Sequence, residues 1–139
     1  MSQVIESMGS KEILNNENTE AMYRQIIEYS VETIIIHLDH KILYINQAGA
    51  DFLKGLKEEI IGSDILSVFH EDEKDLIRER IEQGMNGDAT HAIEKTVIRI
   101  DGSHVDVELY CHPVQFGNKK AIQSVLRDIT IRKETEKML

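Results

Sequence analysis

Apolar residues follow two different spacings along the chain, and the changes between them mark its predicted elements. From Thr19 onward, apolar side chains recur every three or four residues, which predicts an amphipathic helix that begins at this residue. The apolar side chains of this helix are Met22, Tyr23, Ile26 and Ile27. Residues 1–18 before it are polar and show no period, so we expect a flexible leader or linker there.

Two isoleucine-rich runs then predict a β-hairpin. Residues 34–38 and 42–45 are short and β-branched, and the polar residues 39–41 between them are typical of a turn. A strand-turn-strand unit of this length is therefore expected directly after the first helix.

Helical spacing returns after the hairpin. Asn46 suits the N-cap of a helix ending near Gly55, because an asparagine side chain accepts a hydrogen bond from a free amide at a helix start. Residues 58–69 predict short helical turns. A longer helix is predicted to open at His70 and to be closed by Gly84 and Gly87.

The last third of the chain changes to the two-residue period of β-strands. Residues 91–100, 103–114 and 119–128 predict three strands, joined by turns at Asp101-Gly102 and Gly117-Asn118. These turns are short, so the three strands should form an antiparallel meander.

The middle strand of this meander predicts which face of the sheet is buried. One set of alternating positions is apolar and should face the core: Val105, Val107, Leu109 and Cys111. On the opposite face, Tyr110 and Val125 need a cover, so the leading helix is expected to pack there or across a partner chain.

The order of elements predicts an α+β fold. We expect a five-stranded antiparallel sheet with helices packed on one face, plus a flanking helix at each end. Residues 19–130 would form the domain with its leading helix, and residues 131–139 would begin a charged C-terminal helix.

Composition and charge exclude several classes of protein. The 139 residues fit one domain, and a single cysteine cannot form an internal disulfide. The net charge of −9 disfavours binding to nucleic acids or anionic membranes, which requires concentrated positive charge. No apolar run approaches the roughly 20 residues of a membrane-spanning helix. We therefore expect a cytoplasmic protein that acts on neither nucleic acid nor membrane.

Five short motifs occur in a fixed order along the chain. They are Tyr44-Ile45-Asn46-Gln47-Ala48, Ile60-Ile61-Gly62, His70-Glu71-Asp72, Asp101-Gly102-Ser103, and Asp128-Ile129-Thr130 with Arg132-Lys133. Together they resemble the motifs of the PAS (sensory box) family over residues 23–133, although Glu71 stands where the family usually has proline. Residues 125–133 are similar to the exit segment of PAS domains that precede the kinase core in bacillus-type sensor and sporulation histidine kinases.

The resemblance implies a sensory and signal-relay function. Such a domain is regulatory and not itself an enzyme, and nothing in the sequence resembles a phosphate loop, a nucleophile elbow or a catalytic carboxylate pair. It would transmit a ligand or dimer state to an exit helix, with a second copy of the chain and a C-terminal kinase core as partners. Two alternatives are a ligand-free dimerisation module and a PAS domain that regulates another output, such as a cyclic-dinucleotide enzyme or a transcription regulator.

PAS domains bind ligands between the inner face of the sheet and the long helix, and this resemblance implies a set of candidate residues. On the sheet they are Val97, Val107, Leu109, Cys111, Ile122, Ser124 and Leu126, and facing them are Phe52, Ile65, Leu66, Phe69, Ile77 and Ile81. Their almost wholly aliphatic character suits either a solid core or a small apolar ligand.

No cofactor or metal is expected. A photoactive flavin domain of this family needs a cysteine where this chain has Ile65, and haem-binding relatives use a histidine within the long helix, where this chain has none beyond His70 at the start. The run His37-Leu38-Asp39-His40 contains metal-ligand side chains, but a tight turn explains Asp39 equally well.

Three residues at the end of the domain are candidates for signal coupling: Asp128, Thr130 and Arg132. The carboxylate of Asp128 lies at a strand end, where it could bind backbone amides, Arg127 or Arg132. That contact would stiffen the junction between the sheet and the exit helix. The alternative is that Asp128 and Thr130 only cap the strand and form a turn.

Overall fold

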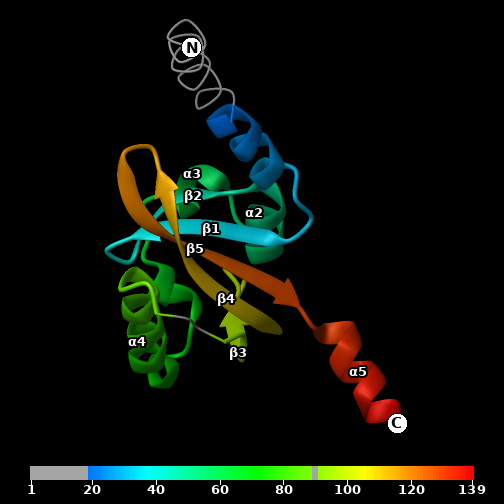
Figure 1. Ribbon diagram of the computed structural model, residues 1–139. Coiled ribbons are helices and arrows are strands. Elements are labelled where there is room, and N and C mark those ends of the chain that lie inside the picture. Colours follow the sequence, from blue (N-terminus) through cyan, green and yellow to red (C-terminus); the bar gives the residue numbers. More distant parts are fainter. Residues whose placement is uncertain (1–18, 89–90) are drawn as a thin grey trace, which may run out of the picture.

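Five strands form one antiparallel sheet in the computed structural model, which describes residues 19–88 and 91–139 (Figure 1). The strands are β1 (Thr33–Leu38), β2 (Lys41–Ile45), β3 (Ile93–Ile98), β4 (His104–Phe116) and β5 (Lys119–Asp128). Their order across the sheet is β2-β1-β5-β4-β3, so the first strand pairs with the last. The predicted sheet is confirmed, while the predicted leader lies outside the described residues.

Helices cover both faces of this sheet (Figure 1). On the inner face lie α2 (Gln47–Leu53), α3 (Lys57–Ile60), the short 3-10 turns η1 (Ile65–Val68) and η2 (Glu71–Glu73), and α4 (Lys74–Met85). Residues 19–28 are helical and pack on the outer face. The last helix, α5 (Thr130–Met138), projects from the end of β5.

The inner core lies between the sheet and α2, α3, η1 and α4. The alternation predicted for β4 is confirmed, since Val105, Val107, Leu109 and Cys111 are all buried in this core. Of the two glycines predicted to close the long helix, Gly87 follows α4 with φ of 81°, whereas Gly84 lies inside the last turn of the helix. A Cβ atom there would come within 3.2 Å of the Ile122 side chain, so the glycine lets α4 approach β5.

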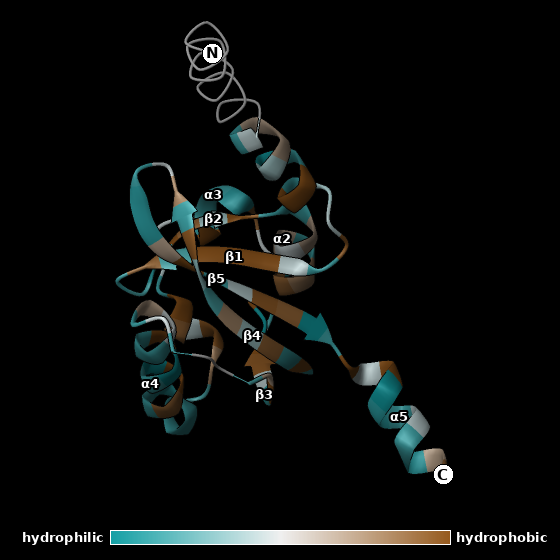
Figure 2. Ribbon diagram, in the orientation of Figure 1, coloured by the Kyte–Doolittle hydropathy of each residue, from teal (hydrophilic) through white to brown (hydrophobic). Residues whose placement is uncertain are grey.

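A smaller outer core holds the leading helix against the sheet. Ile27 is buried beside Ile34, Ile36 and Ala121 of β1 and β5, and the Tyr23 hydroxyl donates a hydrogen bond to Gln123. Figure 2 shows the matching apolar colour along β1, whereas α5 is mostly polar. Burial of a side chain such as Ile27 stabilises the fold by about 2 kcal/mol.

The side chain of Asn46 joins elements from both sides of the sheet. It is fully buried, and its Oδ1 accepts hydrogen bonds from the amides of Gly49 (2.9 Å) and Ile34 (3.1 Å). Its Nδ2 donates to the carbonyls of Ile27 and Glu32, both at 2.8 Å. The predicted N-cap of α2 is confirmed, and the same side chain also fixes the end of the leading helix and the start of β1.

Replacing Asn46 by alanine should therefore destabilise the whole domain. The change removes the partners of buried amide and carbonyl groups, and we expect the free energy of unfolding to fall by about 3 kcal/mol. Urea unfolding measures this change. The control is Asn86→Ala at an exposed position after α4, which should cost less than about 0.5 kcal/mol. Equal losses in both variants would contradict the role assigned to Asn46.

Candidate functional site

The residues predicted to line a ligand pocket lie together on the inner side of the sheet, and most of them pack against one another. Eight belong to the continuous core without lining either neighbouring cleft: Ile65, Leu66, Phe69, Ile77, Val97, Val107, Leu109 and Cys111. Ile81 and Ile122 line a cleft at one end of this core, and Phe52 and Leu126 line another. Ser124 is buried on the same face of β5.

A buried histidine that the sequence analysis did not place in the pocket lies beside these residues. His37 is fully buried near the end of β1, and its Nε2 is 2.8 Å from the Ser124 hydroxyl. The same hydroxyl lies 3.4 Å from the Cys111 sulfur, and burial raises the pKa of that thiol. Within the part of the chain that the structure describes, the second ring nitrogen of His37, Nδ1, has no hydrogen-bond partner.

A cleft of about 330 Å³ adjoins His37, between the β1–β2 hairpin and α4. The residues that line it include the apolar Leu38, Ile81, Met85 and Ile122, together with the charged or titratable Asp39, His40, Arg78 and Glu82. Burial, followed by the charge of His40, lowers the pKa of His37 to about 4. The imidazole next to this cleft is therefore neutral near pH 7.

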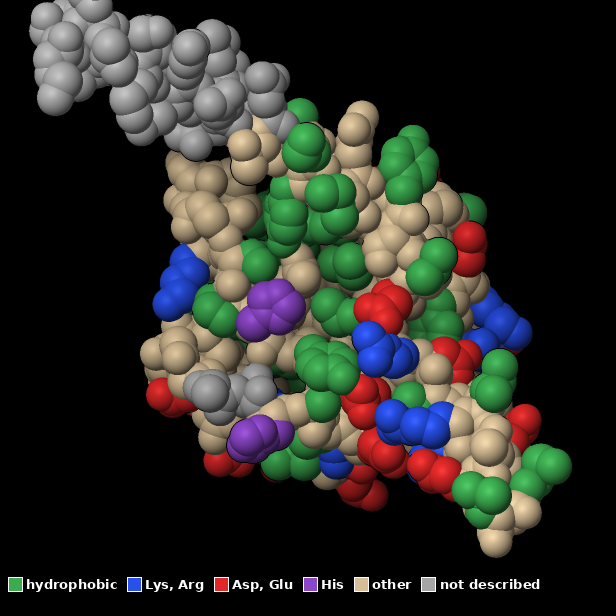
Figure 3. All heavy atoms as spheres, turned by 45° about the vertical axis from the view of Figure 1, so that its right-hand side comes forward, with side chains coloured by type: hydrophobic (Ala, Val, Ile, Leu, Met, Phe, Trp, Pro, Cys, Tyr) green, Lys and Arg blue, Asp and Glu red, His purple; other side chains and the backbone are tan. Residues whose placement is uncertain are grey.

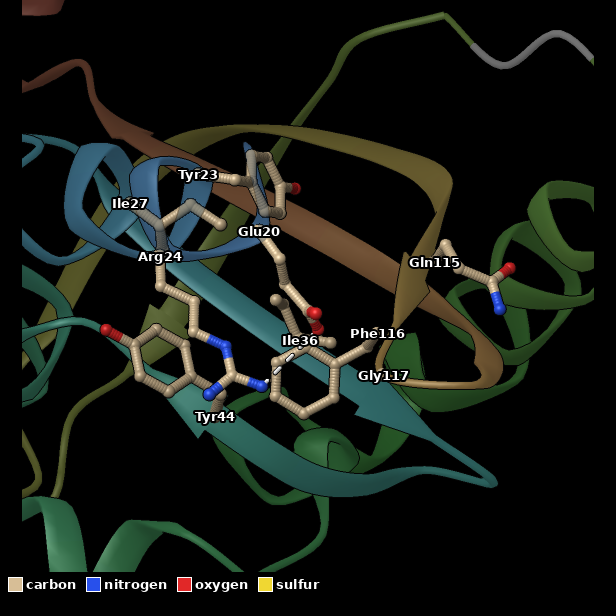
Figure 4. Close-up of a pocket in the computed structure, with 9 residues that line it drawn as sticks. All are labelled: Glu20, Tyr23, Arg24, Ile27, Ile36, Tyr44, Gln115, Phe116 and Gly117. Carbon is tan, nitrogen blue, oxygen red and sulfur yellow. Dashed lines mark ion pairs between the residues drawn. The ribbon is translucent and has the colours of Figure 1, made fainter. Parts of the chain in front are cut away.

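A second, smaller cavity lies on the outer face between the leading helix and the sheet (Figure 4). Its volume is about 140 Å³. The Arg24 side chain extends from the helix into it, and its guanidinium carbon lies 5.8 Å from the centre of the Phe116 ring. Tyr44 lies on the other side of Arg24. The Arg24 guanidinium lies between the two rings, and its contact with Phe116 helps to hold the leading helix on the sheet.

The end of β5 forms a tight junction with α5. The Asp128 carboxylate accepts hydrogen bonds from the Thr130 amide (2.9 Å) and the Thr130 hydroxyl (2.5 Å). Between them, Ile129 is buried, and its amide donates to the Asp106 carbonyl of β4 at 3.2 Å. Of the contacts predicted for Asp128, the one to a backbone amide forms, whereas Arg127 binds Glu32 instead.

Arg132 does not contact Asp128 but joins α5 to the sheet through other acids. Its guanidinium lies 3.1 Å from Glu108 of β4 and 3.0 Å from Glu94 of β3. Lys133 adds contacts to Glu94 (3.5 Å) and Asp106 (3.4 Å). Figure 3 shows these basic and acidic side chains gathered where α5 leaves the sheet. The first turn of α5 is thus fixed to two strands, although the helix contributes no buried residue to the core.

The same arrangement of an aspartate and a hydroxyl residue recurs at a distant turn. In the β3–β4 hairpin, Asp101 accepts hydrogen bonds from the Ser103 amide (3.0 Å) and hydroxyl (2.5 Å). The hydrogen bond from the Ser103 hydroxyl, more than any other contact, lowers the pKa of Asp101 to about 2. This turn is followed by strand β4 and not by an exit helix. A change at Asp101 therefore shows the effect of losing such a turn without disturbing the junction between β5 and α5.

A family model and the fold decide which family these motifs represent. The model described as the PAS domain matches residues 30–130, which is most of the chain. The chain belongs to the PAS domain family. This confirms the resemblance drawn from the five motifs, each of which lies at an element boundary: Asn46 at the start of α2, Gly62 after α3, and Asp128 before α5.

Solved structures support the PAS fold. A PAS domain from Colwellia psychrerythraea is similar with a TM-score of 0.70 and 19% identity, covering 81% of this chain and 98% of that chain. A domain of a sensory box sensor histidine kinase/response regulator from Geobacter sulfurreducens is similar with a TM-score of 0.65 and 22% identity, covering 79% of this chain and 94% of that chain.

A curated relative links this PAS domain to sensor kinases. Sporulation kinase A from Bacillus subtilis (strain 168) is 24% identical over 125 residues, which cover 88% of this chain. The chain spans 21% of the length of that kinase. The match accords with the resemblance to bacillus-type sensor kinases, and a PAS domain is a regulatory module.

The structure places the residues that were compared with cofactor and metal ligands. Ile65 begins η1 and is buried in the core, and His70 precedes η2 on the surface. Within residues 19–88 and 91–139, no three histidine, cysteine or acidic side chains come together as a metal site. His37 binds Ser124, and Asp39 and His40 form the hairpin turn with φ of 52° and 67°.

No helix in the described part of the chain is long and apolar enough to cross a membrane.

The neutral, buried state of His37 should make stability depend on pH. The unfolded chain protonates this imidazole near pH 6.5, whereas the folded chain does so near pH 4. The contribution of the neutral imidazole to the free energy of unfolding is therefore fully present above about pH 6.5. It falls by up to about 3 kcal/mol as the pH falls toward 4.

Urea unfolding at about pH 7 and about pH 4.5 tests this expectation. His37→Gln should lose less stability than the wild type between the two values, because it lacks the titrating group. His112→Gln, on the opposite face of the sheet, should retain the wild-type pH dependence. A wild-type pH dependence in His37→Gln would show that other groups cause the loss.

Proposed function

We propose that this PAS domain is the sensory and relay module of a cytoplasmic sensor histidine kinase. In this role it converts a change in ligand or dimer state into a change in the position or stability of α5. The kinase core would follow α5 and respond to that change. The observation that carries the proposal is the junction of Asp128, Thr130 and Arg132, which binds the exit helix to the sheet at its first turn.

The geometry of the junction supports relay rather than simple capping. A cap would need only the bonds from Asp128 to Thr130. Here Arg132 and Lys133 also reach acids on β3 and β4, so a shift of these strands changes contacts of the helix directly. Exposed ion pairs contribute only about 0–1 kcal/mol each, which suits a connection that must change between two states.

The relatives support the same parent class. Sporulation kinase A and the Geobacter sulfurreducens protein are both named as kinases, and this chain is similar to a segment of each. A PAS domain that regulates a cyclic-dinucleotide enzyme or a transcription regulator would use the same junction, so the output domain decides between these proposals.

A second candidate function, dimerisation, is favoured by the exposed side of the leading helix. Tyr23 and Ile27 pack on the sheet of their own chain, whereas Met22 and Ile26 are 60% and 64% exposed. Tyr29 continues this apolar stripe one turn later and is 82% exposed. A stripe at this spacing suits pairing with the same helix of a second copy.

Asp128→Ala should loosen α5 without unfolding the domain. Loss of the bonds to Thr130 costs about 1 kcal/mol locally, so the amides of Thr130 and Lys133, which donate to Asp128 and to the Ile129 carbonyl, should exchange hydrogen about fivefold faster. In the full-length parent, autophosphorylation should no longer respond to the signal that regulates the wild type. Asp101→Ala removes the equivalent turn in the β3–β4 hairpin and serves as the matched control.

The outcomes of this pair of variants are distinct. Faster exchange in α5 and lost regulation for Asp128→Ala, with neither effect for Asp101→Ala, support relay through the junction. Normal regulation of the parent with Asp128→Ala would overturn the proposal.

Replacing Met22 and Ile26 by glutamate should weaken dimers of the chain. These side chains contribute little to their own core, so the monomer should stay folded while charge repulsion at the interface raises the dimer dissociation constant at least about tenfold. Analytical ultracentrifugation over a concentration series measures this constant. Leu76→Glu, at an exposed apolar position on α4, is the control. An unchanged sedimentation mass for the double variant would exclude this interface.

A further inference from the structure

The cavity on the outer face of the sheet combines apolar walls with one guanidinium group (Figure 4). Arg24 supplies the guanidinium from the leading helix. The apolar walls come from Tyr23 and Ile27 of the same helix and from Ile36, Tyr44 and Phe116 of the sheet. We propose that this cavity binds a small aromatic carboxylate, whose ring packs among these walls and whose carboxylate pairs with Arg24.

The volume of the cavity suits a single six-membered ring. An apolar cavity of roughly 150 Å³ holds a benzene molecule. The outer cavity measures about 140 Å³ and is partly open to solvent, so a ring can enter it while a charged substituent stays near the surface. Ring faces and edges pack favourably on other aromatic rings, and Phe116 and Tyr23 provide such partners.

Arg24 has hydrogen-bonding capacity that its own chain leaves unused. A guanidinium carries five N–H donors. Within residues 19–88 and 91–139, Arg24 makes no hydrogen bond, and its ion pair with Glu20 is 3.6 Å long between side chains that are 62% and 50% exposed. The planar fork of an arginine matches a carboxylate with two parallel hydrogen bonds. A ligand carboxylate would therefore make a better contact with Arg24 than Glu20 does.

Cations of the protein itself already lie against the aromatic rings. The guanidinium carbon of Arg24 is 5.8 Å from the centre of the Phe116 ring, and the Lys57 ammonium is 5.5 Å from the centre of the Tyr44 ring. A cationic ligand would compete with both groups and be repelled by them. Glu28 cannot attract such a ligand freely, because it binds Lys57 and the Tyr44 hydroxyl. These charges favour an anion over a cation.

A ligand in this cavity would contact the leading helix and the sheet together. Arg24 belongs to the helix, whereas Ile36 lies on β1 and Phe116 on β4. Because the cavity exists only while the helix is packed on the sheet, binding should stabilise that arrangement. The site shares no residue with the junction between β5 and α5, so this inference goes beyond the proposed relay function and does not depend on it.

Benzoate is the probe for the 139-residue chain, and methyl NMR of the isoleucines reports where it binds. Ile27 and Ile36 line the outer cavity, whereas Ile81 and Ile122 line the cleft on the inner side. Benzoate should shift the methyl signals of the first pair and leave those of the second pair unchanged. Benzamide lacks the charge, acetate lacks the ring and benzylamine has the opposite charge. Each of them should bind at least about tenfold more weakly than benzoate.

Three variants test the role assigned to the guanidinium. Arg24→Gln should weaken benzoate binding at least about tenfold. Arg78→Gln is the matched control, because it removes an exposed arginine on α4 with the same change in net charge, and it should leave the affinity unchanged. Glu20→Gln removes the competing carboxylate and should tighten binding about threefold. This last variant tests the site through a gain in affinity, so it does not depend on how well the helix of Arg24→Gln stays packed.

Several results would overturn the ligand assignment. They are the absence of methyl shifts at Ile27 and Ile36, shifts at Ile81 and Ile122 in their place, and binding of any comparison probe as tight as that of benzoate. Equal affinities of Arg24→Gln and Arg78→Gln, or no gain in Glu20→Gln, would also contradict it. None of these results affects relay through the junction, which is tested by regulation of the full-length parent. Lost relay with intact benzoate binding would instead overturn the proposed function alone.

Discussion

The fold depends on one buried hydrogen-bond centre, the Asn46 side chain. Where the first hairpin turns into α2, amides and carbonyls from different elements converge without regular partners, and a single amide side chain satisfies Gly49, Ile34, Ile27 and Glu32. This constraint fixes the leading helix on the outer face relative to α2 on the inner face. The two cores therefore cannot shift independently, because both pack against the same sheet.

Within this sheet, β5 connects the cleft beside His37 to the last helix, α5. β5 lies between β1 and β4, pairs with both, and continues directly into the junction with α5. His37 of β1 touches β5 through Ser124, and Arg132 of α5 touches β4 through Glu108. The contacts at the cleft are buried, whereas those at the junction are partly exposed and weak. This difference suits a stable sensor with an adjustable output.

The sequence predicted the elements well because their signals are local. Alternation in β4 and the turn at Asp101-Gly102 depend only on neighbouring residues, and both were correct. The bonds of Arg132 to Glu94 and Glu108 join residues far apart, and a chain with 25 acidic residues offers too many partners for spacing to choose between them. His37 was missed as a pocket residue, although alternation with Ile35 on β1 would have placed it on the inner face.

We propose that the junction of β5 and α5 changes between signalling states. The most direct test is hydrogen exchange of the proposed full-length kinase, measured in its active and inactive states, at the hydrogen-bonded amides of Thr130 and Lys133. We expect a clear difference in protection at these amides between the two states, with no difference in the middle of β1. Identical protection of the first turn of α5 in both states would contradict it.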